Sequence, residues 1–116
     1  MKKIVDVAKE TDTYIHLRIA REKVYQDAVM QLKQELMAAG GEGPKHIIVD
    51  LSAVSAMNSA GLGILILLRE TKEKAGARVI VYGLSEVMAQ LFEQMKLGNL
   101  FSITADEESA VAVACK

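Results

Sequence analysis

The chain has 116 residues and a net charge of −1, and 51% of its residues are hydrophobic while 25% are charged. This length fits one domain that buries about 60–70% of the surface of its unfolded chain, and the composition is that of a globular and not a disordered chain. Basic and acidic residues are interspersed without a basic stripe, which argues against nucleic acid or an anionic membrane surface as a partner.

Cysteine content and hydrophobic runs limit the expected compartment. Cys115 is the only cysteine, so neither an intrachain disulfide nor a cysteine-based zinc site is expected, which fits a reducing environment. The longest strongly apolar run, residues 62–68, is too short to span a bilayer. Asp6 makes the start of the chain acidic before a signal-peptide core could form. We therefore expect one cytoplasmic domain over residues 1–116.

Three strands are predicted in the first half of the chain. Apolar and polar residues alternate in residues 4–7 and 14–19, with a polar turn over residues 9–13 between them. Residues 46–51 instead form a continuous run rich in β-branched side chains, which is typical of a strand covered on both faces.

A helix is predicted between the second and third strands. It begins near Val24, where apolar residues start to recur every four positions, and it ends in the glycine-rich loop of residues 40–44. The recurring residues are Val24, Ala28, Leu32 and Leu36.

The second half alternates helices with strands. Asn58 is a candidate N-cap for a helix over residues 59–74, because its side chain can accept a hydrogen bond from a free amide of the first turn. A buried strand over residues 78–82 and a third helix capped by Ser85 follow. The expected apolar stripe of the third helix consists of Val87, Met88, Leu91, Phe92 and Met95.

The last elements are a short strand and a helix. Residues 100–103 predict the strand, and Thr104 with Glu107 three residues later forms a capping box for the helix. Val111 and Val113 alternate as they would in a strand, which is the alternative for this segment.

This order of elements predicts a single α/β domain. We expect a mostly parallel sheet of four to five strands with an antiparallel N-terminal strand, packed by about four helices. Functional loops of such sheets tend to lie beyond the carboxyl ends of the strands, and the turn with Asn58 and Ser59 follows such an end.

Patterns typical of enzymes fail on their context. Gly61 and Gly63 follow a strand, but Ile66 stands where a dinucleotide-binding fingerprint has its third glycine. The glycine-rich segment 40–45 precedes a strand, and Met57 replaces the first glycine of a nucleophile elbow around Ser59. The two histidines share no metal-ligand spacing. We expect no catalytic site, metal or cofactor.

Asp50 superficially fits the phospho-acceptor aspartate of a response-regulator receiver domain. Such a domain also has an acidic pair after its first strand and a lysine after its fifth. Residues 8–10 here read Ala-Lys-Glu, and residues 101–104 contain no lysine. We therefore interpret Asp50 as a strand-end residue before a turn, and covalent chemistry at Asp50 or Ser59 is the alternative with the least support.

The segment from Asn58 onwards carries the functional signal. Residues 61–68 are apolar on every side of the expected helix, which indicates either complete burial or a face that meets a partner. Ser59 lies in the first turn, where free amides and the helix dipole tolerate a phosphate. That phosphate would add about −1.5 to −2 charge beside a docked partner. A plain capping serine is the alternative for Ser59.

Two stretches, residues 48–54 and 57–63, read IVDLSAV and MNSAGLG. They closely resemble the central signature of STAS domains, and particularly that of bacterial anti-sigma-factor antagonists. The resemblance continues in residues 76–79, 91–92 and 97–101 and covers the chain from about Val24.

The resemblance implies a partner-switching mechanism. The unmodified antagonist binds an anti-sigma factor that is also a serine kinase, the kinase phosphorylates the serine at the position of Ser59, and a PP2C-type phosphatase reverses this. It implies no cofactor and a phosphosite turn of Asn58, Ala60 and Gly61. We expect a monomer or weak homodimer. The implied partner-binding residues are Glu22, Lys23, Val24, Tyr25, Asn58, Leu62, Gly63 and Ile66.

Two departures from the family pattern lie on that implied surface. Asn58 replaces the family's aspartate before the acceptor serine, and Ala60 replaces its second hydroxyl residue. The turn of residues 22–25 lacks the family's glycine and aspartate. The alternative function is therefore a STAS scaffold or ligand-sensing module that is never phosphorylated.

Overall fold

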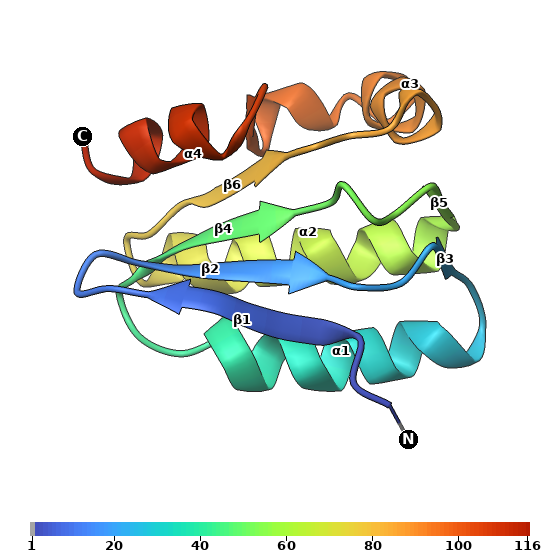
Figure 1. The fold of residues 1–116 in the computed structure, drawn as a ribbon, viewed down its shortest axis with the longest axis horizontal. Coiled ribbons are helices and arrows are strands. Elements are labelled where there is room, and N and C mark those ends of the chain that lie inside the picture. Colours follow the sequence, from blue (N-terminus) through green and yellow to red (C-terminus); the bar gives the residue numbers. More distant parts are fainter. Residues whose placement is uncertain (1) are drawn as a thin grey trace.

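The computed structural model describes residues 2–116 as a five-stranded sheet with helices on both faces (Figure 1). Its strands are β1 Val5–Glu10, β2 Tyr14–Ile19, β3 Lys23–Val24, β4 His46–Asp50, β5 Ala56–Met57, β6 Val79–Tyr82 and β7 Ser102–Thr104. Its helices are α1 Asp27–Gly40, α2 Ser59–Lys74, α3 Glu86–Gln94 and α4 Glu107–Ala114, with a 3-10 turn, η1, at Leu97–Asn99.

The main sheet has the strand order β1-β2-β4-β6-β7. The β1–β2 pair is antiparallel, and the β2–β4, β4–β6 and β6–β7 pairs are parallel. This confirms the α/β fold with a mostly parallel sheet, an antiparallel N-terminal strand and four helices. The two-residue strands β3 and β5 form a separate parallel pair that the sequence did not predict.

Each face of the sheet has its own hydrophobic core. Side chains from α1, α2 and α3 pack on one face in the larger core, whereas α4 packs on the other face in the smaller one (Figure 1). In β4, Ile47 and Val49 belong to the larger core and Ile48 to the smaller one, and all three are fully buried. The prediction that this strand is covered on both faces is confirmed.

The first helix begins at Asp27, so the prediction that it begins near Val24 is wrong. Val24 belongs to β3, and its carbonyl oxygen accepts a hydrogen bond from the amide of Asn58. Its side chain is fully buried, which explains why it extends the apolar pattern of the helix without being helical. Gln26 then takes a φ of 46° and turns the chain into α1.

The terminal helix forms as predicted, but the proposed capping box is wrong. Asp106 is the N-cap, and its Oδ1 accepts a hydrogen bond from the amide of Ser109 at 2.8 Å. Thr104 is still in β7, where its hydroxyl donates to the carbonyl of Val81 at 3.2 Å. The pairing of β7 with β6 thus delays the helix by two residues.

The expected apolar stripe of α3 is only partly buried. Met88 and Phe92 lie in the larger core, and Leu91 is half-buried against it. Val87 and Met95 are 56% and 47% exposed, so only part of the expected stripe packs against the core. The helix contacts the sheet along a narrower strip than the sequence indicates.

Lys72 is a charged residue buried in the protein interior. The side chain is fully buried in α2, and its Nζ donates to the carbonyl oxygen of Gly43 at 2.8 Å. Burial lowers the pKa of the Lys72 ammonium. The unfolded chain therefore binds more protons than the folded chain between the lowered pKa and the usual one, and stability rises with pH across that interval.

We predict that Lys72→Met raises the free energy of unfolding by about 1 kcal/mol near neutral pH, because the buried charge is removed while the side-chain volume is kept. Urea denaturation at several alkaline pH values should also show a weaker increase of stability with pH in the variant. Exposed Lys74 provides the matched control, Lys74→Met, for which we expect no change beyond about 0.5 kcal/mol. Equal effects of the two substitutions would contradict this interpretation.

Gly83 and Gly76 both have positive φ, 77° and 76°, but in different surroundings. A Cβ at Gly83 would lie 3.0 Å from the Cβ and the amide nitrogen of Ser52, whereas a Cβ at Gly76 would meet nothing within 4 Å. Gly83 follows β6 and holds the chain close to the turn after β4.

We predict that Gly76→Ala lowers the free energy of unfolding by about 1 kcal/mol through backbone strain alone. Gly83→Ala should lower it by about 2–3 kcal/mol, because overpacking against Ser52 adds to the strain. Chemical denaturation of both variants measures the difference, and equal losses would show that Ser52 moves aside freely.

Candidate functional site

The candidate site lies where the loop after β4 meets the turn before α1. The carbonyl oxygen of Glu22 accepts hydrogen bonds from the amide of Ser55 at 2.8 Å, from the hydroxyl of Ser55 at 3.1 Å and from the amide of Ala56 at 3.3 Å. The amide of Asn58 donates to the carbonyl of Val24 at 3.2 Å. These bonds place residues 22–25 beside residues 55–58 at the carboxyl end of β4, as expected for a functional loop of such a sheet.

Asn58 is the N-cap of α2, as predicted. Its backbone is extended, and its Oδ1 accepts a hydrogen bond from the amide of Gly61 at 2.9 Å. Ser59 is the first residue of the helix and is exposed, as is Ala60. Asn58 and not Ser59 makes the cap, so the alternative of a plain capping serine is wrong, and the Ser59 hydroxyl can be modified without removal of the capping bond.

Gly61 allows α2 to approach β3 and β5 closely. A Cβ at this position would lie 3.2 Å from the Cβ of Met57, 3.3 Å from its sulfur and 3.4 Å from a methyl group of Val24. Gly63, two residues later, lies on the exposed side of the helix, where a Cβ would meet nothing within 4 Å. Gly61 thus has a packing role, whereas Gly63 leaves bare helix backbone at the surface.

The apolar residues 61–68 of α2 were expected to be either completely buried or partly exposed to a partner, and the structure shows some of each. Leu62 is fully buried together with Leu65 and Leu68, whereas Ile64 and Ile66 are only half-buried. One side of the helix is core, and another borders the surface.

Two of the expected partner-binding residues are not available in this conformation. Val24 and Leu62 are 0% exposed, because both fill the core beneath the turn, so their side chains form no part of the accessible surface. Glu22, Lys23 and Tyr25 are exposed, Gly63 is exposed, and Ile66 is half-buried.

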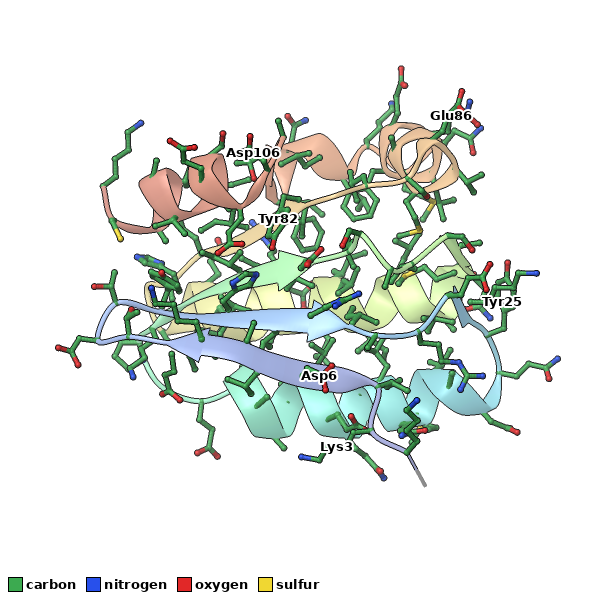
Figure 2. The ribbon with its side chains drawn as sticks, in the orientation of Figure 1. Lys3, Asp6, Tyr25, Tyr82, Glu86 and Asp106 are labelled. Carbon is green, nitrogen blue, oxygen red and sulfur yellow. The ribbon has the colours of Figure 1, made fainter. Side chains whose placement is uncertain are left out.

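Exposed apolar side chains lie on the elements next to this surface: Tyr25 was expected there, whereas Met30 and Val87 were not. Met30 on α1 is 58% exposed, Val87 on α3 is 56% exposed, and Tyr25 is 42% exposed. The start of α3 is tied to the site by a hydrogen bond from the hydroxyl of Ser85 to the carbonyl of Ser55 at 3.1 Å. Figure 2 shows Tyr25 and Glu86, the first residue of α3, at the same end of the molecule. Periodicity could not reveal the exposure of Val87, because this residue stands in the apolar pattern of α3.

Asp50 is a strand-end residue, as interpreted from the sequence. Its Oδ1 accepts a hydrogen bond from the amide of Ser52 at 2.8 Å, which starts the turn after β4. Tyr82 lies beside it on β6, and its pKa is raised by burial and by the negative charges of Asp50 and Glu107. His16 Nε2 lies 2.7 Å from the Tyr82 hydroxyl, and these side chains close the polar end of the smaller core.

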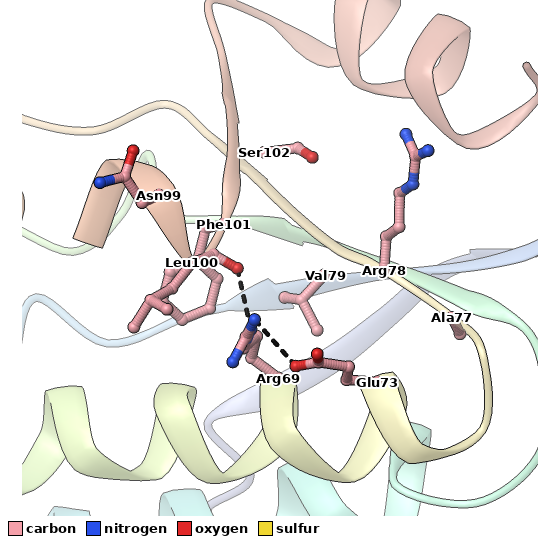
Figure 3. A pocket seen from close by; sticks show the side chains of 9 residues that line it. All are labelled: Arg69, Glu73, Ala77, Arg78, Val79, Asn99, Leu100, Phe101 and Ser102. Atoms are coloured by element: carbon pink, nitrogen blue, oxygen red, sulfur yellow. Dashed lines mark hydrogen bonds and ion pairs between the residues drawn. The ribbon is translucent and has the colours of Figure 1, made fainter.

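A cavity of about 240 Å³ lies at the opposite end of β6 (Figure 3). Its lining combines the end of α2, the start of β6 and the segment before β7, with Arg69, Glu73, Arg78, Asn99 and Ser102 as polar residues. Arg69 already donates from Nε to the carbonyl of Leu100 at 3.1 Å and pairs with Glu73 at 2.8 Å. This cavity starts beside Val79, whereas the Ser59 turn follows the other end of the strands.

Two classes of feature are absent from the described part of the chain. Within residues 2–116, no three metal-ligating side chains are grouped so that they could hold a metal ion. None of the helices over the same residues has the length and hydrophobicity needed to cross a membrane.

Comparison with known proteins finds that the chain is similar to several proteins described as anti-sigma factor antagonists. A protein of Bordetella bronchiseptica named "Putative anti-sigma factor antagonist BtrV" is 24% identical over 82 residues, which is 71% of each chain. The structure of the anti-sigma factor antagonist SpoIIAA in its unphosphorylated form matches with a TM-score of 0.77 and 21% identity, over 97% of each chain. The Bacillus SpoIIAA in its phosphorylated form matches with a TM-score of 0.70 and 23% identity, over 94% of this chain and 98% of that chain.

The same fold also occurs inside a larger protein. The murine anion transporter Slc26a9 matches 93% of this chain with a TM-score of 0.80 and 19% identity, but only 18% of the transporter chain takes part. The sequence profile of the STAS domain matches residues 6–110, which is most of the chain. Because this profile covers most of the chain, the chain belongs to the STAS-domain family.

Proposed function

We propose that this protein is an anti-sigma-factor antagonist of a partner-switching pathway. In its unmodified form it binds an anti-sigma factor that is also a serine kinase, and phosphorylation of Ser59 releases it. A PP2C-type phosphatase restores the binding form. The protein itself acts by binding and not by catalysis, and the ATP belongs to the kinase.

The observation that carries this proposal is the position of Ser59. The residue is exposed, it is the first residue of a 16-residue helix, and the capping bond beside it is made by Asn58. Phosphate on Ser59 would lie at the positive end of the α2 dipole, so the fold should tolerate it. The modification therefore changes the surface and leaves the interior intact.

The surface around Ser59 supports the release step. Tyr25, Met30 and Val87 are exposed apolar residues on the elements that surround the turn, and such groups favour a partner that covers them. A phosphate adds about −1.5 to −2 charge next to this surface, and the partner would have to desolvate or repel it. Docking and phosphorylation thus compete for the same place.

A second candidate is a STAS scaffold or ligand-sensing module that is never phosphorylated. Asn58 removes a carboxylate that the family presents beside its acceptor serine, and Ala60 removes a second hydroxyl. The 240 Å³ cavity with Arg69 and Arg78 would be the place for a small ligand. In that case partner binding would not respond to ATP.

We predict that a purified anti-sigma-factor kinase and ATP add one phosphate to this protein, at Ser59. Intact-mass and peptide mass spectrometry measure this, with Ser59→Ala as the variant that should stay unmodified. A kinase that binds the protein and leaves Ser59 unmodified in the presence of ATP would contradict the switch and favour the scaffold.

We also predict that Ser59→Asp weakens binding to the kinase more than tenfold while the melting temperature changes by less than about 2 °C, since the added charge lies at a helix N-terminus. Ser109→Asp is the matched control: it adds the same charge to the exposed first turn of α4, and it should leave affinity unchanged. Titration calorimetry and thermal denaturation give the two values. A large loss of stability in Ser59→Asp would instead assign Ser59 a structural role.

A further inference from the structure

β1 is an open edge of the main sheet, and five of its six residues are exposed. The carbonyl of Ile4 accepts a hydrogen bond from the amide of Ala20 at 2.7 Å. In an antiparallel pair the direction of the backbone groups alternates, so the N–H and C=O groups of Val5 and Val7 point away from β2. Glu35 Oε1 accepts from the amide of Val5 at 2.9 Å, which leaves Val7 as the residue before the bulge of β1 with both backbone groups directed at the open edge.

A groove of about 500 Å³ runs between this edge and α1. Its apolar lining is formed by Val5, Val7, Ala38 and Ala39, and its polar lining by Lys3, Asp6, Gln34 and Glu35. The two alanines leave room beside β1, and Val7 is 54% exposed at the groove. An apolar side chain on an added strand would fill this space.

We infer that a second copy of this chain occupies the groove through antiparallel pairing of the two β1 strands about a two-fold axis at Val7. The amide of each Val7 donates to the carbonyl of the partner's Val7, which satisfies the groups directed at the edge. Both Val7 side chains then lie on the α1 side, where each contributes to closing the groove of the other copy.

The charges along β1 favour this register. In the β1–β2 register, Asp6 stands opposite Arg18 and Lys9 stands opposite His16. Pairing about Val7 brings Asp6 of each copy close to the partner's Lys9, twice in the dimer. A register centred on Asp6 would place the two Asp6 carboxylates opposite each other and is disfavoured.

The same features limit the strength of the dimer. The register of β1 shifts between Val7 and Lys9, so a bulge interrupts the ladder directly after the central pair. Few backbone bonds can form, and the contact lies at the small end of protein interfaces, which indicates weak and reversible association. Figure 2 shows Asp6 and Lys3 apart from Tyr25, which lies at the end that carries the Ser59 turn, so each copy keeps that turn free.

Sedimentation equilibrium of the full chain under reducing conditions tests this inference. The apparent mass of the wild type should rise above 12.6 kDa with concentration. Val7→Lys should reduce the association constant at least tenfold, whereas Val87→Lys, at an equally exposed valine on α3, should associate like the wild type. A wild type that stays monomeric up to millimolar concentration would overturn the dimer and leave the groove to a strand of another protein.

Disulfide trapping locates the contact independently. In a Cys115→Ser background, Val7→Cys should give at least tenfold more covalent dimer under mild oxidation than Val87→Cys at the same concentration. Equal crosslinking of the two variants would refute pairing at Val7. Neither experiment requires phosphorylation or a kinase, so their failure would leave the proposed function of the Ser59 turn standing.

Discussion

The geometry of the functional end depends on the backbone bonds between residues 22–24 and residues 55–58. The carbonyl of Glu22 accepts three hydrogen bonds from Ser55 and Ala56, and the carbonyl of Val24 accepts one from Asn58. These bonds fix the chain before α1 to the chain before α2. Asn58 donates its amide to Val24 and is also the N-cap of α2. The first turn of that helix therefore has a defined position on the surface.

Packing beneath the turn makes this position rigid. Val24, Met57 and Leu62 belong to the larger core, and a Cβ at Gly61 would crowd the side chains of Met57 and Val24. The residues above them, Ser59 and Ala60, are exposed. A modification of the Ser59 side chain would thus be separated from the core by a single helical turn, so that it could alter the surface without disturbing the packing beneath.

Most of the architecture could be predicted from the sequence because its signals are local. Alternation, four-residue recurrence and helix-capping side chains identified the five strands of the main sheet and the four helices, and the N-cap role of Asn58 was confirmed. The start of α1 was mispredicted because burial of Val24 continues the helical period into a strand. The cap of α4 was mispredicted because Thr104 serves the β6–β7 pairing, a contact between residues distant in sequence.

The sequence predicted the Ser59 turn and its neighbour, residues 22–25, but not which of the surrounding apolar side chains are exposed. Ser59 and the turn of residues 22–25 were expected together, and the structure places them together through β3 and β5, which are too short to give a pattern of their own. The exposure of Met30 and Val87 and the burial of Leu62 depend on how wide each helix contact is, whereas Val24 is buried as part of β3. Helical periodicity identifies the apolar side of a helix, but its neighbours decide how much of that side is covered.

The unequal cover of the two sheet faces has a consequence for biosynthesis. Three helices supply side chains to one face, whereas Tyr14, Ile48, Ile80 and Tyr82 on the other face pack against α4 with its small residues Ala110 and Ala114. Because α4 follows in sequence every strand that it covers, this apolar face of the sheet stays exposed on the growing chain until the helix has left the ribosome. A chaperone that recognises exposed apolar strands would therefore meet this protein late in its synthesis and on one side only.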